Sequence, residues 1–274
     1  MQQLFAVLSP LAYLVALSLF RQDLDIEDTP DRRRRRVAWA VLAFALHSGF
    51  FAWQVQALGG VPSLGFFSFL SALAYALMLF YGLLLVRGEA RGSGIGSVVV
   101  AVAFVLHTAG MALGDLTPVT DPSHSALFLA LHVLCILVAS AALVLSGIFG
   151  VLYLALYRRL REHRVGRLFS ALPSLTELAG LMRRTAIVAA GLLLLATNGG
   201  IWWAHAVGVE NFTYGEPFVW VILSLTVYFA LIGSSGRIPL ITARRASIAA
   251  SLGLALLAIG LAFSFDSFHS WELR

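Results

Sequence analysis

Residues 126–156 read ALFLALHVLCILVASAALVLSGIFGVLYLAL, an apolar run that contains no Asp, Glu, Lys or Arg. A bilayer core of roughly 30 Å is crossed by about 20 helical residues, so this run is long enough to span a membrane. Long continuous apolar runs indicate helices rather than membrane barrels, because barrel strands are short and alternate in polarity. The stretch therefore predicts a membrane-spanning α-helix.

The rest of the chain has the same character. It is 59% hydrophobic and 12% charged, and its mean hydropathy of +0.87 is too high for a soluble domain. We therefore predict an all-α, polytopic integral membrane protein of about eight transmembrane helices, which form a single domain over residues 1–274. The predicted spans lie near residues 3–20, 37–56, 66–86, 95–113, 126–156, 185–204, 217–234 and 246–264.

The basic residues predict the orientation of these spans. All 19 are arginines, and every one except Arg274 follows the first, third, fifth or seventh predicted span. Because cytoplasmic loops near helix ends contain the excess of positive charge, we expect both termini on the non-cytoplasmic side. The first span is preceded only by Met-Gln-Gln. That start lacks the positive charge of a signal peptide, so we expect the span to be retained.

The arginines also indicate what the cytoplasmic face contacts. They give a net charge of +5 and lie next to predicted membrane helices, which favours anionic lipid headgroups over nucleic acid as partners. Within the cytoplasmic stretch 157–184, leucines and one phenylalanine alternate with arginines, and Pro173 interrupts the pattern. We interpret this stretch as an amphipathic segment at the membrane surface.

Several function classes find no support in the sequence. The single cysteine, Cys135, lies inside a predicted span, so no intramolecular disulfide or CxxC pair can form. There is no Walker A, HExxH or GxSxG motif. The sequence thus offers no catalytic residue, and whether the protein is an enzyme is left open.

The histidines are the informative polar residues. His47 and His107 lie inside the second and fourth predicted spans, His132 lies at the outer end of the fifth, and His269 lies just beyond the eighth. Ionisable groups within a membrane are costly and tend to mark ligand sites. A single buried histidine more often hydrogen-bonds to a neighbouring helix, but several on the outer side favour heme, whose iron commonly takes imidazole as an axial ligand. A structural zinc site would need about four ligands, usually with cysteine.

Five strings give the chain a resemblance to a known family. They are Leu46-His47-Ser48-Gly49, then Gly60-Val61-Pro62-Ser63, Leu131-His132-Val133, Leu172-Pro173-Ser174-Leu175, and Phe268-His269-Ser270-Trp271. In order and spacing they resemble the CcsA/ResC/CcmC superfamily of heme-handling membrane proteins of cytochrome c biogenesis. The likeness is nearest to its CcsA-like and HemX-like members and covers most of the chain.

The resemblance implies a set of heme ligands. By position, His132 and His269 would be the two external ligands, with Trp271 beside His269, and His47 would be one of a membrane-embedded pair. The family's second membrane histidine is missing here, and His107 is the candidate replacement. The tryptophan-rich loop is degenerate, and only Trp202, Trp203 and Glu216 match it.

These observations predict a heme-binding protein of the bacterial cytoplasmic membrane. It would hold or move non-covalent, b-type heme as a carrier or chaperone, and a cytochrome c maturation partner would act on the outer face. Three alternatives stay open: a HemX-like membrane regulator of tetrapyrrole synthesis, a b-type bis-histidine electron carrier, and a heme-free transporter of small solutes.

Overall fold

The structure is a computed structural model that describes residues 2–24, 29–58, 66–89, 93–113, 126–163, 166–207 and 217–267. Every regular element in these ranges is an α-helix, which confirms the all-α fold class. The helices are α1 (Gln2–Gln22), α2 (Pro30–Leu58), α3 (Phe66–Val86), α4 (Ser93–Leu113), α5 (Ala126–Arg161), α6 (Arg167–Ser170), α7 (Leu175–Val207), α8 (Pro217–Ser234) and α9 (Ala243–Ser267).

Helices α3 and α8 have the bounds predicted from hydropathy, whereas α2 begins earlier than its apolar run. It starts at Pro30, ahead of the arginine run 32–36. Proline suits the first turn of a helix, where its missing N–H would have no intrahelical partner, and Asp31 places a negative charge at the positive end of the helix dipole. Hydropathy finds the part of a helix that lies in lipid, while capping residues decide where the helix begins.

The segment 157–184 was predicted to be one amphipathic segment, and the structure divides it among three helices. Helix α5 continues to Arg161, the single turn α6 follows, and α7 begins at Leu175 and runs on without a break. Pro173 has no backbone N–H and favours a break at this point. The next residues, Ser174 to Glu177, have the S-x-x-E pattern of a capping box, which starts a new helix.

Six helices, α1 to α5 and α7, are long and apolar enough to cross a membrane within the residues described. The described apolar part of α8, Val219–Ser234, is shorter. The chain is thus a multi-pass membrane protein. The count of eight spans, the orientation of the termini and the single domain stay predictions.

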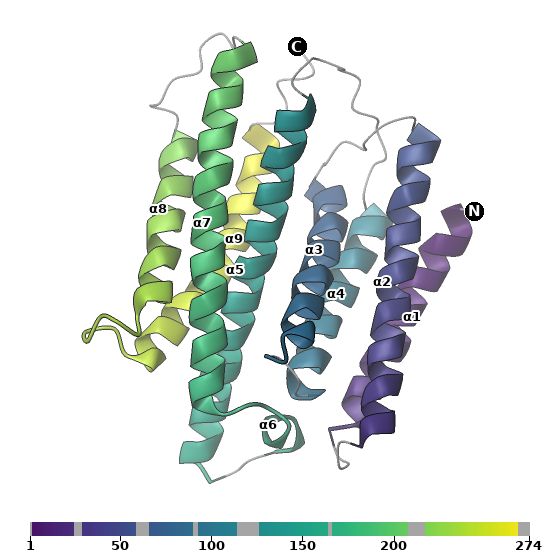
Figure 1. Cartoon of the computed structure of the whole chain (residues 1–274), viewed down its shortest axis with the longest axis vertical. Helices are drawn as coiled ribbons and strands as arrows, with labels where there is room; N and C mark the ends of the chain where they lie inside the picture. The colour runs from purple at the N-terminus through teal and green to yellow at the C-terminus, as the bar shows by residue number, and fades with distance from the viewer. Residues whose placement is uncertain are drawn as a thin grey trace. The chain divides into compact units, whose positions relative to one another are not determined.

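By its internal contacts, the chain forms two compact units. Unit 1 comprises Met1–Val119 and Leu156–Ser174, and its helices α1 to α4 lie side by side (Figure 1). Contacts between α1 and α2, α2 and α3, α3 and α4, and α4 and α1 close a ring in which neighbours run antiparallel. The centre of unit 1 is therefore reached by side chains from all four helices.

Unit 2 comprises Thr120–Ala155 and Leu175–Arg274, and glycines allow its helices to pack closely. A methyl group at Gly147 of α5 would lie 2.7 Å from Leu254 Cβ of α9, and one at Gly253 of α9 would lie 2.5 Å from the Phe229 ring of α8. Small residues at such contacts are typical of membrane helix pairs, because they let backbones approach.

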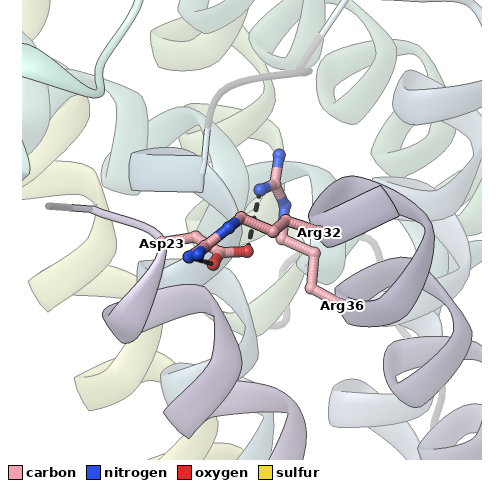
Figure 2. A network of polar contacts seen from close by, with 3 residues as sticks. All are labelled: Asp23, Arg32 and Arg36. Carbon is pink, nitrogen blue, oxygen red and sulfur yellow. Dashed lines mark hydrogen bonds and ion pairs between the residues drawn. The ribbon is translucent and has the colours of Figure 1, made fainter. Parts of the chain in front are cut away.

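A buried ion pair closes one end of unit 1. Asp23, just after α1, and Arg36 of α2 are 3% and 1% exposed, and Arg36 Nη1 lies 3.1 Å from Asp23 Oδ2. Arg32, whose side chain is 36% exposed, approaches the other carboxylate oxygen at 3.6 Å (Figure 2). The guanidinium of Arg36 also lies over the Phe20 ring, at 5.7 Å from its centroid.

Candidate functional site

The two membrane histidines lie together at the centre of unit 1. His47 of α2 and His107 of α4 are both completely buried, and their ring centroids are 3.7 Å apart with the planes tilted by 35°. The sequence pointed to the same pair as joint ligands of one membrane site. The structure brings the two rings into contact, while their role as heme ligands stays a prediction.

Hydroxyl groups contact all four nitrogens of this pair. Tyr13 Oη of α1 is 3.0 Å from His47 Nδ1, and Ser71 Oγ of α3 is 3.2 Å from His47 Nε2. The same Ser71 Oγ is 2.9 Å from His107 Nδ1, and Ser9 Oγ of α1 is 2.8 Å from His107 Nε2. We call these five side chains the hydroxyl–histidine chain.

Aromatic rings surround the two imidazoles. Phe51 stacks on the His47 ring at 5.0 Å between centroids, and Tyr75 meets its edge at 5.4 Å. Phe50 meets His107 edge-on at 5.8 Å. Since Phe50 and Phe51 follow His47 on α2, the aromatic run in the sequence forms the wall of the polar cluster.

In this arrangement the pair does not fit a heme held between two imidazoles. Metal–imidazole bonds of about 2 Å on opposite faces of the macrocycle would separate the ring centroids by roughly 6 Å. The observed 3.7 Å is direct ring contact, and each nitrogen that could bind iron is already within hydrogen-bonding distance of a hydroxyl. Heme ligation here would require the rings to separate and these hydrogen bonds to break.

His132 of α5 has a different environment in unit 2. It is partly exposed, and its Nδ1 lies 2.8 Å from the backbone oxygen of Ala196 in α7. A carbonyl oxygen can only accept, so Nδ1 is the protonated nitrogen and the lone pair of a neutral ring lies on Nε2. A metal-binding histidine usually has this arrangement, in which a carbonyl or carboxylate fixes the ring through the other nitrogen.

Gly200 of α7 allows the His132 ring to lie against the helix backbone. A methyl group at position 200 would be 2.7 Å from the ring atom Cε1 and 3.0 Å from Nδ1. At the neighbouring Gly199 an added methyl group would meet nothing within 4 Å. The Gly-Gly pair before Trp202 therefore has one position that accommodates the imidazole and one that does not touch it.

The other predicted site residues are only partly described. Trp202 of α7 is 53% exposed, and Trp203 belongs to the same helix. His269 and Trp271 lie outside the described residues. Within the described ranges, no group of three or more His, Cys, Asp or Glu side chains is placed to hold a metal ion.

Sequence reasoning missed the hydroxyl partners of the histidines. Ser9 and Tyr13 are four positions apart on α1, and Ser71 and Tyr75 are four apart on α3. Residues at this spacing share one face of a helix. Two such polar pairs in otherwise apolar spans were the signal that these helices face a common polar centre.

Comparison with known proteins places the chain among membrane proteins of heme metabolism. Residues 36–269, most of the chain, match the family described as "Cytochrome C assembly protein". The chain is also similar to "Protein HemX" of Brevibacillus brevis, with 28% identity over 246 residues that cover 88% of this chain and 89% of that protein. No solved structure matches significantly.

Proposed function

This chain belongs to the cytochrome c assembly protein family and is a heme-related membrane protein, and we propose that it binds heme through His132 in unit 2. One observation carries the proposal. The hydrogen bond from His132 Nδ1–H to the Ala196 carbonyl presents Nε2 as the nitrogen that can ligate iron. Sequence resemblance and geometry thus favour the same residue.

His269 is the proposed second ligand by its position in the family resemblance, and it lies outside the described residues. Helices α5 and α9 pack against each other in unit 2. A methyl group at Gly147 of α5 would meet Leu254 of α9, and one at Gly150 would meet Ser247, Ala250 and Ser251. His132 on α5 and His269 would then ligate one heme together.

The chain's own residues would orient and shield the group. Bound heme would supply the iron that accepts the imidazole nitrogens. The Ala196 carbonyl would hold the His132 ring in one tautomer, and Gly200 would let that ring lie close to α7. Trp202 and Trp203 of α7, and Trp271, would supply aromatic surface near the macrocycle. The heme would be held without covalent attachment, since the chain has no CxxC pair.

The arginine-bearing ends of the helices are the proposed contact with anionic groups. At the turn between α8 and α9, an open pocket of about 560 Å³ is lined mainly by apolar surface and includes two arginines. It is lined by Pro239, Leu240, Thr242, Arg244, Arg245 and Ile248. Anionic lipid headgroups suit such a surface, and so do the two propionates of heme. We propose that heme is loaded from this side and passed to a cytochrome c maturation partner on the outer face.

A second function, regulation of tetrapyrrole synthesis, is favoured by one observation. A similar protein is named "Protein HemX", and only Trp202, Trp203 and Glu216 match the tryptophan-rich loop of the resemblance. Deletion of the gene separates the two functions. Loss of cytochromes c with normal heme precursors supports assembly, whereas altered precursor levels with normal cytochromes c support regulation.

The test of heme binding is an absorption spectrum and a pyridine hemochrome assay on the detergent-purified protein. His132→Ala and His269→Ala should lower heme content or give a one-histidine spectrum, and added imidazole should partly restore it. His205→Ala is the matched control, because His205 is exposed on α7. If both variants retain the wild-type spectrum and occupancy, the proposed site is wrong. Reversible reduction by quinol would instead identify an electron carrier, and absence of any chromophore would favour a solute transporter.

A further inference from the structure

The hydroxyl–histidine chain of unit 1 joins four helices through five side chains. Ser9 and Tyr13 come from α1, His47 from α2, Ser71 from α3 and His107 from α4. All five are almost fully inaccessible, with exposed fractions of 3% or less. We propose that these residues form a single proton-ordered hydrogen-bond chain that holds α1 to α4 together, and that this chain takes the place of a heme site in unit 1.

The direction of the chain follows from Ser9. Its one hydroxyl hydrogen is donated to the backbone oxygen of Phe5, at 2.7 Å. At His107 Nε2, 2.8 Å away, Ser9 must therefore accept. His107 carries its proton on Nε2, so its Nδ1 is an acceptor, and Ser71 donates to it at 2.9 Å.

The remaining two links follow in the same way. Ser71 has given its only hydrogen to His107, so at 3.2 Å it accepts from Nε2–H of His47. The Nδ1 of His47 is then an acceptor, and the hydroxyl of Tyr13 donates to it at 3.0 Å. Both imidazoles are neutral and carry the proton on Nε2. Every hydroxyl and ring N–H hydrogen in the chain is then donated once, and each Nδ1 lone pair accepts once.

The reverse direction satisfies fewer groups. If Ser9 donated to His107, the donor and the acceptor would exchange roles in every other hydrogen bond of the chain. The Nδ1–H of His47 would then donate to the Tyr13 oxygen. The Tyr13 hydroxyl hydrogen would then have no acceptor among the residues that the structure describes. A buried donor without a partner is costly in an apolar surrounding, so the first direction is favoured.

This arrangement excludes iron from the pair as it stands. The lone pair of each histidine, at Nδ1, is occupied by a hydroxyl hydrogen, and each Nε2 bears a proton. Ser71 is the central element, because it is the single group that connects the two imidazoles. The inference does not depend on His132, and it explains how hydrogen bonds can stabilise two neutral histidines inside a membrane helix bundle.

The direct test is ¹⁵N NMR of the detergent-solubilised protein labelled at histidine. We expect His47 and His107 to be neutral Nε2–H tautomers with hydrogen-bonded Nδ1. When ferric heme is added, their signals should persist, whereas an iron-ligating histidine would be shifted or broadened beyond detection by the paramagnetic centre. Nδ1–H tautomers, a charged imidazole, or loss of these two signals on heme binding would each overturn the proposal.

Substitutions that keep the shape of the site give a second test. Tyr13→Phe and Ser71→Ala should each lower Tm and leave heme content per folded molecule unchanged. Ser71→Thr should retain much of the wild-type Tm because it keeps the hydroxyl. Ser18→Ala is the control, since Ser18 is an exposed serine on α1 that bonds only to the backbone of its own helix. A wild-type Tm in both Tyr13→Phe and Ser71→Ala would overturn the proposal that the hydroxyl–histidine chain holds α1 to α4 together. If the wild-type protein binds no heme at all, the proposed function fails while the tautomer test still stands.

Discussion

The two units use histidine in opposite ways. In unit 1, His47 and His107 are fully buried and both nitrogens of each ring meet a hydroxyl. In unit 2, His132 is partly exposed, and a backbone carbonyl fixes its tautomer so that Nε2 is the nitrogen suited to iron. Burial of a histidine does not by itself show which of its nitrogens could bind a metal. The better guide is the chemical nature of the hydrogen-bond partner. A carbonyl bonded to one ring nitrogen fixes the other nitrogen as the acceptor, whereas two hydroxyls engage both ring nitrogens in hydrogen bonds.

The largest effect should come from the polar residues that stabilise unit 1. Arg36→Met would leave Asp23, which is 3% exposed, without its closest partner. Breaking a buried ion pair by removing one partner costs about 3–5 kcal/mol. The variant should therefore unfold at a much lower denaturant concentration than the wild type when both are titrated in detergent. The matched change Arg32→Met should cost about 1 kcal/mol or less, because that side chain is 36% exposed.

Heme content refines this first experiment. If unit 1 is structural, folded Arg36→Met should bind as much heme per molecule as the wild type. The double variant Asp23→Asn with Arg36→Met should recover part of the lost stability, since it leaves no unpaired charge. Equal stability of the Arg36→Met and Arg32→Met variants would show that burial of this pair has no energetic weight.

Adding a methyl group at Gly200 in unit 2 should have the opposite effect, with weaker heme binding and little loss of stability. Gly200→Ala would place Cβ 2.7 Å from the His132 ring and force the ring away from Ala196. Loss of such a supporting contact weakens metal sites roughly 10- to 100-fold, so heme titration should give a correspondingly higher Kd with a small change in Tm. Gly199→Ala, which meets nothing within 4 Å, is the control. Equal heme affinity of the two variants would show that His132 does not ligate the heme.

Acidification should release heme bound in unit 2, and this effect should be smaller than that of the Gly200 substitution. A protonated imidazole cannot ligate iron, so heme bound through His132 should be released as the pH falls through the range in which histidine takes up a proton. Absorbance at the heme band, followed from pH 8 to pH 5, measures this release. A flat profile would argue against histidine ligation.

The smallest effect is expected at the exposed pair after α5. Arg158 Nε donates to Glu162 Oε1 at 2.8 Å, and this hydrogen bond lowers the pKa of the Glu162 carboxyl. A lowered folded-state pKa stabilises the protein above the pKa of the unfolded chain, and the contribution disappears as the pH falls through the folded-state value. Because both side chains are solvated, Glu162→Gln should leave Tm and heme content within error.

Hydropathy alone was sufficient for the all-α class and for the location of the long helices. It could not set their ends, because the start of α2 at Pro30 depends on capping chemistry and that of α7 at Leu175 on the motif from Ser174. The pairing of His47 with His107 in one membrane site was predicted from the family resemblance, in which His107 replaces a missing membrane histidine. Their hydroxyl partners did not, since Ser9 and Ser71 are small, common in membrane helices and able to bond to their own backbone.

The Ala196 carbonyl that orients His132 could not have been predicted, because every residue has a carbonyl and only the packing of α5 on α7 selects one. Gly200 was visible in the sequence, but a glycine in an apolar helix has several explanations. The different hydrogen-bond partners of the histidines thus depended on atoms that the amino-acid sequence does not distinguish.

The ion pair between Asp23 and Arg36 has a consequence for biosynthesis. Its partners are 13 positions apart, and closing it needs only the turn between α1 and α2. The first helical hairpin can therefore neutralise its carboxylate as soon as the start of α2 has left the ribosome, before α3 has been made. A nascent chain truncated after α2 should then already form this ion pair, with no later helix required to compensate the charge of Asp23.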